Sequence, residues 1–293
     1  MSTHVRFRSI PKLLCLVTLF LVATQGASAQ ISISSVDHLR AFAAGAQWKL
    51  MSSPGGQPQP FHLGAPSDVA QTWDFTTQMW SFTTALESVD PAGTPFLTAF
   101  PAANIVELNR SPSPGIDIFV YYELTPTTLS MLGSGRDAKS SPQKPPLPVR
   151  KFPCTLGMAW SAESEPESPV PGITYTRRYS WTVDAFGTLK LPEMDLPVLR
   201  IRSVLTVTTE TPAGSSHKRE ISYQFVSKDL AGANVTIDTS DDGNADVVAH
   251  GQYTLGAPTS AGELPAMATA LNIGPAYPQP SSTLARIPVH LRD

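Results

Sequence analysis

Two strand-like segments separated by turn residues lie within residues 179–209, and they constrain the fold more than any other stretch. Apolar and polar residues alternate over residues 199–207, which is the two-residue period of a half-buried strand. We expect the turn at residues 186–188, where Gly187 permits a positive φ, and a strand edge at Pro192, which cannot donate a ladder hydrogen bond. The stretch therefore predicts a β-hairpin at the centre of the chain.

The rest of the chain carries similar short segments and little helical periodicity. The 293 residues include 28 prolines and 19 glycines, a composition of turns and strands. Roughly ten strands can be counted between turn signals. Residues 36–44 are expected to form a short helix, and residues 134–150, which are polar and Pro-rich, are expected to form a mobile loop. The pattern predicts an all-β body, a β-sandwich or jelly-roll-like fold, over residues 30–256.

The N-terminal residues have the layout of a secretory signal peptide. Basic residues up to Lys12 precede an apolar run at 13–23, and the small residues Ala27-Ser28-Ala29 precede Gln30. The apolar run is too short for a permanent anchor. We therefore expect residues 1–29 to be removed on export, which leaves no stable membrane span.

Charge and cysteine usage narrow the functional classes. The chain holds 21 Lys and Arg against 24 Asp and Glu, and the expected signal peptide contains three of the basic residues and no acid, so the mature chain has 18 against 24, or −6. This acidic excess argues against binding of nucleic acid or an anionic membrane. Since Cys15 lies in the leader, Cys154 has no intramolecular partner, and we interpret it as a buried small apolar residue rather than a nucleophile.

Two stretches resemble segments of uncharacterised secreted β-rich bacterial proteins. One is VDAFGTLKLP at residues 183–192 followed by VLRIR at 198–202, and the other is FPCTLGMAWS at 152–161. The pattern in that family runs aspartate, aromatic, Gly-Thr-Leu and Leu-Pro, and then Val-Leu-Arg. The resemblance implies a secreted β-rich fold and carries no activity with it.

The C-terminal residues resemble the opening of the sorting domain carried by cargo of the bacterial type IX secretion system. After a linker at 257–270, residues 271–293 contain AYPQP and SSTLARIPV, similar to a Tyr-Pro-Asn-Pro element that precedes a first strand. Gln279 stands in place of the asparagine, and Asp293 comes before the further strands of that domain. The resemblance implies the type IX machinery as a partner and an extracellular or cell-surface location, or a periplasmic one if the partial domain does not function.

An acidic segment near the end of the β body is the candidate metal site. Residues 238–246 read DTSDDGNAD, so oxygen-bearing side chains recur at alternate positions and Gly243 permits a sharp bend. The twelfth position is Ala249, so the bidentate glutamate of an EF-hand is absent, and an acidic β-turn accounts for the same residues. The candidate Ca²⁺ ligands are Asp238, Ser240, Asp242 and Asp246.

Three functional hypotheses remain open at this point. The first is a secreted or cell-surface binding or structural protein without enzymatic activity, with a surface glycan or protein as partner. The second is a carbohydrate-binding module whose aromatic platform would be Trp73, Trp80, Tyr121 and Tyr122. The third is a hydrolase using two carboxylates, drawn from Glu107, Asp117, Glu123, Asp184 and Asp195. Gly133-Ser134-Gly135 lacks the flanking pattern of a nucleophile elbow, and the six histidines show no zinc-ligand spacing.

Overall fold

The all-β class predicted from the sequence is confirmed by the computed structural model. It describes residues 31–54, 57–110, 117–165, 172–228, 233–239 and 246–255, all within the compact unit that begins at Ile31. The expected signal peptide, the linker and the sorting-domain-like tail lie outside the described residues. The described part contains sixteen strands, one short α-helix and two 3₁₀ turns.

The elements of the first half of the chain, in order, are β1 (Ser32–Ile33), α2 (Ser35–Ala41), β2 (Gln47–Ser52), β3 (Gln59–His62), β4 (Gln71–Asp74), β5 (Ser81–Val89), η2 (Pro91–Gly93), η3 (Leu97–Ala99), β6 (Ile105–Arg110), β7 (Ile118–Leu124) and β8 (Thr128–Arg136). Those of the second half are β9 (Lys139–Lys151), β10 (Cys154–Thr155), β11 (Ala159–Ser164), β12 (Thr174–Leu191), β13 (Met194–Thr211), β14 (Gly214–Ser227), β15 (Ala233–Thr239) and β16 (Asp246–Leu255).

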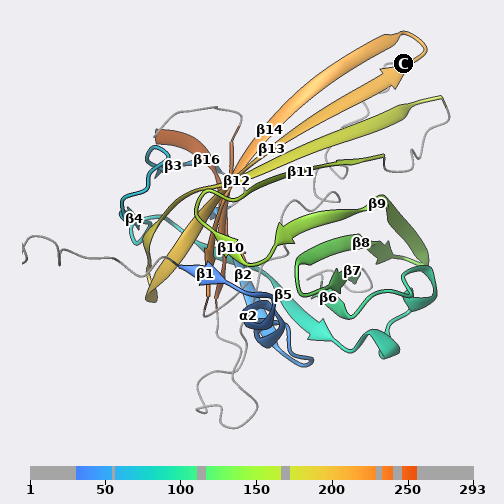
Figure 1. The fold of residues 1–293 in the computed structure, drawn as a ribbon, viewed down its shortest axis with the longest axis horizontal. Coiled ribbons are helices and arrows are strands. Elements are labelled where there is room, and N and C mark those ends of the chain that lie inside the picture. The colour runs from blue at the N-terminus through green and yellow to red at the C-terminus, as the bar shows by residue number, and fades with distance from the viewer. Residues whose placement is uncertain are drawn as a thin grey trace, which may run out of the picture. The chain divides into compact units, whose positions relative to one another are not determined.

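One large sheet holds most of these strands (Figure 1). Its order is β11-β12-β13-β14-β15-β16-β2-β5-β6-β7-β8-β9, with β3 paired to β16 and β4 paired in parallel to β12. The two ends of this order also meet, because the Glu165 N–H donates to the Lys144 carbonyl at 3.0 Å and the Trp160 indole donates to the Pro148 carbonyl at 2.9 Å. The sheet thus folds back over its own core, which is consistent with the predicted sandwich class.

The central strands β12 and β13 are covered on both faces. One face contributes Trp181 and Ile201 to a first buried cluster, and the other contributes Leu189 and Val198 to a second. The alternation of apolar and polar residues over 199–207 therefore does not separate buried side chains from solvent-exposed ones. Arg200, on the side of the strand that the pattern assigns to polar residues, is fully buried.

The predicted turn at residues 186–188 is wrong. β12 continues without interruption to Leu191, and the hairpin turn lies at Pro192-Glu193, so only the edge at Pro192 was correctly placed. Gly187 lies opposite Gln71 of β4, and a Cβ at this position would overlap the backbone of Gln71. The absence of a side chain at Gly187 therefore allows β4 to approach closely, and the glycine is not part of a turn.

The predicted mobile loop at residues 134–150 is also wrong, since these residues belong to the hairpin of β8 and β9. Its turn is formed by Asp137 and Ala138, whose φ values are 49° and 64°. Prolines are tolerated in β9 because this strand stands at one end of the sheet order, where one edge needs no ladder donors. The short helix is present, but it spans Ser35–Ala41, with Ser34 and Asp37 forming a capping box.

The two stretches that resemble secreted β-rich proteins meet at a bulge in β12. Asp184 lies at this bulge and accepts a hydrogen bond from Arg200 Nε at 2.8 Å. Beside it, the Gly157 N–H donates to the Val183 carbonyl at 2.9 Å, and the Val183 N–H donates to the Met158 carbonyl at 2.8 Å. The quoted residues thus have a structural explanation, because they join the β10–β11 connection to the central hairpin.

Glu107 is an uncompensated acid within the sheet. It is fully buried on β6, neither carboxylate oxygen has a hydrogen-bond partner among the described residues, and burial raises its pKa well above the usual range. Val120 lies directly opposite on β7. The native state therefore holds this carboxyl in its protonated form at a pH where the unfolded chain would release the proton.

We predict that this proton makes stability fall as the pH rises. The pKa of this carboxyl in the unfolded chain is 4.5. Above that pH the native state binds more protons than the unfolded state, so the free energy of unfolding falls with rising pH until the pKa of the folded state is passed. The loss is about 1.4 kcal/mol for each unit by which the pKa is raised. Denaturant titrations from pH 4 to pH 8 should show this slope reduced in Glu107→Gln. The control Val120→Ala should lower stability equally at every pH, and an unchanged slope in Glu107→Gln would contradict the prediction.

Candidate functional site

The proposed calcium ligands lie partly outside the described residues. Asp238 is in β15, opposite Ser222 on β14 and His250 on β16. Asp246 opens β16 four residues before His250, which places its Cα about 13 Å along the strand from that partner. Ser240 and Asp242 are not among the described residues, and within the described ranges no group of three His, Cys, Asp or Glu side chains could hold a metal ion. The calcium site stays a prediction.

The row through Asp238 contains the residue types of a serine hydrolase, but in an unsuitable order. Ser203, Ser222, Asp238 and His250 face one another on four successive strands, and the Ser203 and Ser222 hydroxyls are 2.7 Å apart. In a triad the histidine must lie between serine and aspartate to take the serine proton. Here the aspartate takes the middle place, so the row does not form a triad.

The predicted aromatic platform is not formed. Trp73, Tyr121 and Tyr122 are each at most 1% exposed. Trp80 is partly buried, with its ring centroid 4.7 Å from that of Tyr253. These aromatic residues belong to the core, so a carbohydrate-binding module would need a different surface.

The five acids considered for a hydrolase are scattered. Glu107 is buried in the sheet, Asp184 is paired with Arg200, Asp195 is exposed on β13, and Glu123 is half-buried at the end of β7. Asp117 differs from them because it lines an open cleft of about 490 Å³. The full lining consists of Pro95, Phe96, Asp117, Phe119, Asp137 and Ala138.

Two glycines of β8 make room for the aromatic side of this cleft. A Cβ on Gly135 would overlap the ring of Phe96, and a Cβ on Gly133 would lie 2.6 Å from the ring of Phe100. The Phe96 N–H donates to the Tyr121 hydroxyl at 3.1 Å, which fixes the loop above the sheet. Gly133-Ser134-Gly135 therefore lies within a strand, where the two glycines leave room for aromatic rings, and it is not a nucleophile elbow.

The rings of Phe96 and Phe119 form two walls of the cleft. Their centroids are 6.2 Å apart and their planes are inclined by 62°. Phe119 lies opposite Gly135 in the β7–β8 ladder, and the ring of Phe96 occupies the space that a side chain at Gly135 would fill, so the two half-buried rings pack against each other at the cleft. A flat or apolar portion of a ligand can contact them.

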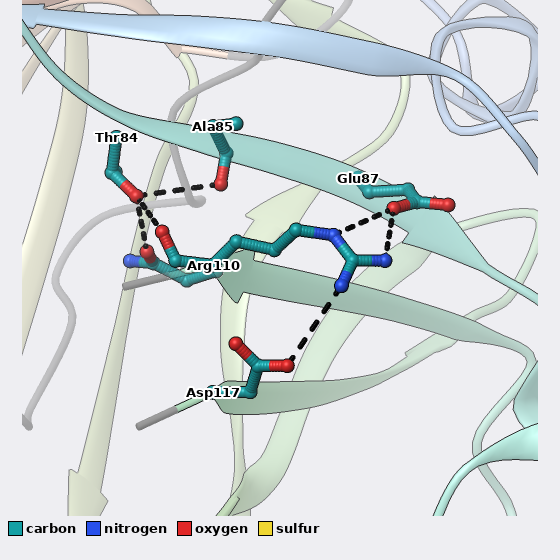
Figure 2. Close-up of polar contacts among 6 residues, drawn as sticks. Thr84, Ala85, Glu87, Arg110 and Asp117 are labelled. Atoms are coloured by element: carbon teal, nitrogen blue, oxygen red, sulfur yellow. Dashed lines mark hydrogen bonds and ion pairs between the residues drawn. The ribbon is translucent and has the colours of Figure 1, made fainter. Parts of the chain in front are cut away.

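Arginines accompany both carboxylates of the cleft. Arg110 donates to Glu87 from Nη2 at 2.7 Å and from Nε at 3.1 Å, whereas its Nη1 is 3.8 Å from Asp117 (Figure 2). Thr84 holds the backbone of Arg110 by donating to its carbonyl oxygen. At the β8–β9 turn, Arg136 Nε is 3.0 Å from Asp137. Arg110 makes its two hydrogen bonds to Glu87, so its positive charge offsets the negative charge of Asp117 only weakly.

Sequence reasoning missed Asp137 and both phenylalanines of the cleft. The turn at Asp137-Ala138 lacks the Asn-Gly or Asp-Gly pair that usually identifies such a hairpin. The available signal was the pair of glycines, Gly133 and Gly135, on one face of a strand, followed by the charged residues Arg136 and Asp137. It does not indicate that the residues preceding β6 would lie over those glycines.

Cys154 is confirmed as a buried residue. It has no exposed surface and forms no disulfide, and burial raises the pKa of its thiol to about 11. The thiolate is the nucleophilic form of cysteine, so this environment disfavours catalysis. Its backbone belongs to β10, which pairs with β1.

Comparison of the chain with protein-family models, curated proteins and solved structures gives no match. No helix in the described residues combines the length and apolar character needed to span a membrane. The geometry of the cleft and the sequence patterns at the two ends of the chain are therefore the features that indicate a function.

Proposed function

We propose that this chain is an exported binding protein without enzymatic activity, and that the cleft is its ligand site. The observation that carries the proposal is the convergence of two partly accessible phenyl rings and two carboxylates on one concave surface. The rings offer apolar contact area, and Asp117 and Asp137 offer hydrogen-bond acceptors that fix orientation. The signal-peptide pattern and the sorting-domain-like tail support export, with the type IX machinery as the transport partner.

The β8–β9 turn places Asp137 at the rim of the cleft. Asp137 and Ala138 have φ values of 49° and 64°, and they form a two-residue turn between the paired Arg136 and Lys139. Hairpin turns of this length commonly require a positive φ at both central positions. The hairpin itself therefore accounts for the left-handed conformation, and its consequence for the site is the position of Asp137.

A ligand panel tests the proposal. Neutral oligosaccharides and small neutral, anionic and cationic molecules would be added to the full chain, and the melting temperature recorded. A ligand present at a hundred times its Kd is expected to stabilise the protein by about 2.7 kcal/mol. The double variant Asp117→Asn/Asp137→Asn should lose this stabilisation, while Asp195→Asn, which alters an exposed aspartate outside the cleft lining, should retain it. Absence of any stabilising ligand, or equal stabilisation of both variants, would reject the cleft as the site.

The same two carboxylates favour a hydrolase as the second candidate. Asp117 directly precedes β7 and Asp137 lies in the β8–β9 turn, yet both line one cleft, which is the minimal requirement for an acidic pair. Each has an arginine within 4 Å, an arrangement that also suits binding without catalysis. Turnover of aryl glycosides by the parent, lost in both Asp117→Asn and Asp137→Asn, would favour the hydrolase over the binding protein.

A further inference from the structure

We infer that the cleft takes an organic cation, an ammonium or guanidinium group, which is held between the phenyl rings and the two aspartates. The inference depends on the proposed binding function and specifies its ligand class. Three properties of the lining carry it: the absence of side-chain donors, the local charge, and the accessible ring faces.

The polar side chains that line the cleft are acceptors only. None of the six lining residues has a side-chain hydrogen-bond donor, since aspartate is the only polar residue type among them. Pro95 has no backbone N–H, and the N–H of Phe96 is engaged by the Tyr121 hydroxyl. The lining side chains therefore offer acceptors, which an ammonium or guanidinium group complements and an anion does not.

The local charge is negative. Glu87, Arg110, Asp117, Arg136 and Asp137 together provide three carboxylates and two guanidinium groups, a net charge of −1. Arg110 makes its hydrogen bonds to Glu87, so the more weakly compensated carboxylate is the one on the cleft.

The next basic residue along the chain does not reverse this charge. Lys139 pairs with Arg136 across the hairpin, one position away from the Gly135–Ser140 pair. Successive side chains of a strand point to opposite faces of the sheet, so the side chain of Lys139 leaves the backbone on the face opposite to that of Phe119 and Gly135. The cleft side of the hairpin thus keeps its excess of negative charge.

The rings complete the site for a cation. An ammonium or guanidinium group within about 6 Å of an aromatic centroid is attracted by the negative face of the ring. Phe96 and Phe119 pack edge to face, with their planes inclined by 62°, and both half-buried rings line the cleft beside the carboxylates. Neither ring carries a hydroxyl or an indole N–H, so the rings add no donors that would favour a sugar or an anion.

A matched set of probes tests this inference by calorimetric titration of the full chain. Benzamidinium, benzamide and benzoate have similar size and shape but carry positive, zero and negative charge. Nα-acetyl-lysine amide and Nα,Nε-diacetyl-lysine amide repeat the comparison with an aliphatic ammonium, which separates attraction of the charge from stacking of an aromatic ring. We expect the two cations to bind at least tenfold more tightly than their neutral counterparts, with affinity falling as salt is raised from 0.05 to 0.5 M.

The same titrations are made on two variants. Asp117→Asn/Asp137→Asn keeps the size of both side chains and should weaken cation binding at least tenfold, whereas Asp195→Asn should leave it unchanged. Equal or tighter binding of the neutral or anionic probes, or binding only of an uncharged member of the ligand panel, would overturn the cation inference while the binding function stands. Failure of every probe and every panel member would overturn both.

Discussion

Replacing Arg200 by alanine is expected to lower the free energy of unfolding by about 3–5 kcal/mol, the usual cost of removing one partner of a buried ion pair. Arg200 is fully buried, and its guanidinium carbon lies 5.8 Å from the Trp73 ring centroid and 5.3 Å from that of Tyr223. It donates to Asp184 and to the carbonyls of Leu63 and Gly64. Removing it leaves the buried Asp184 carboxylate and the Gly64 carbonyl without this donor, whereas the Leu63 carbonyl still accepts from the Trp73 indole at 2.8 Å.

Denaturant unfolding followed by tryptophan fluorescence measures this change. Combining Arg200→Met with Asp184→Leu should recover part of the loss, because no unpaired charge then remains in the core. Arg178→Ala, on the neighbouring strand β12, is the control. Arg178 lies only 2.6 Å from Glu163, but both side chains are solvent-exposed, so its removal should leave stability unchanged within error. If Arg200→Ala changed the free energy of unfolding by less than about 1 kcal/mol, the buried Arg200–Asp184 pair would not be what joins the central hairpin to the chain at Leu63-Gly64.

The second large effect is expected at Gly187. A Cβ there would overlap the backbone of Gln71, which cannot move aside like the end of a flexible side chain. Gly187→Ala should therefore displace β4 and loosen Trp73 and Phe75, two aromatics of the second core cluster. Losing part of their burial is expected to cost roughly 2–5 kcal/mol.

Denaturant unfolding and the near-ultraviolet circular dichroism of the tryptophans would report this displacement. Gly93→Ala is the matched control, because a Cβ at Gly93 would meet nothing within 4 Å. Its stability should change by less than about 0.5 kcal/mol. A similarly small change in Gly187→Ala would mean that β4 adjusts without loss, and the close approach would then have no energetic importance.

Either result bears on the two stretches that resemble secreted β-rich proteins. Asp184, Gly187 and Arg200 all lie in them, and the structure gives each a part in joining the central hairpin to its neighbours. No reacting group is required to explain these residues. The ligand site is instead expected in the cleft, which those stretches do not contribute to.

Local patterns were sufficient for several features of the fold. Alternation and turn composition predict the all-β class, Ser34 and Asp37 cap α2 close to where a helix was expected, and Cys154 is buried, in agreement with its interpretation as a small apolar residue. These features depend on residues that are close together in the sequence.

Other features could not be read from local patterns. Pro-rich β9 looks like a loop until its place at the end of the sheet order is known, and Gly187 looks like a turn residue until β4 is found beside it. The cleft is the clearest case, because Phe96 comes to lie over Gly135, 39 residues later in the chain.

Local sequence patterns are enough to establish that this chain forms strands, where most of them lie, and that its core depends on burial without a disulfide. Long-range strand pairing establishes which glycines accommodate a neighbour, which arginine is buried in an ion pair, and which acids share a concave surface. This is because alternation along a strand specifies two faces but does not specify what covers them. In this protein both faces of the central strands are covered, and the cleft is formed where one covering segment leaves two phenyl rings partly accessible.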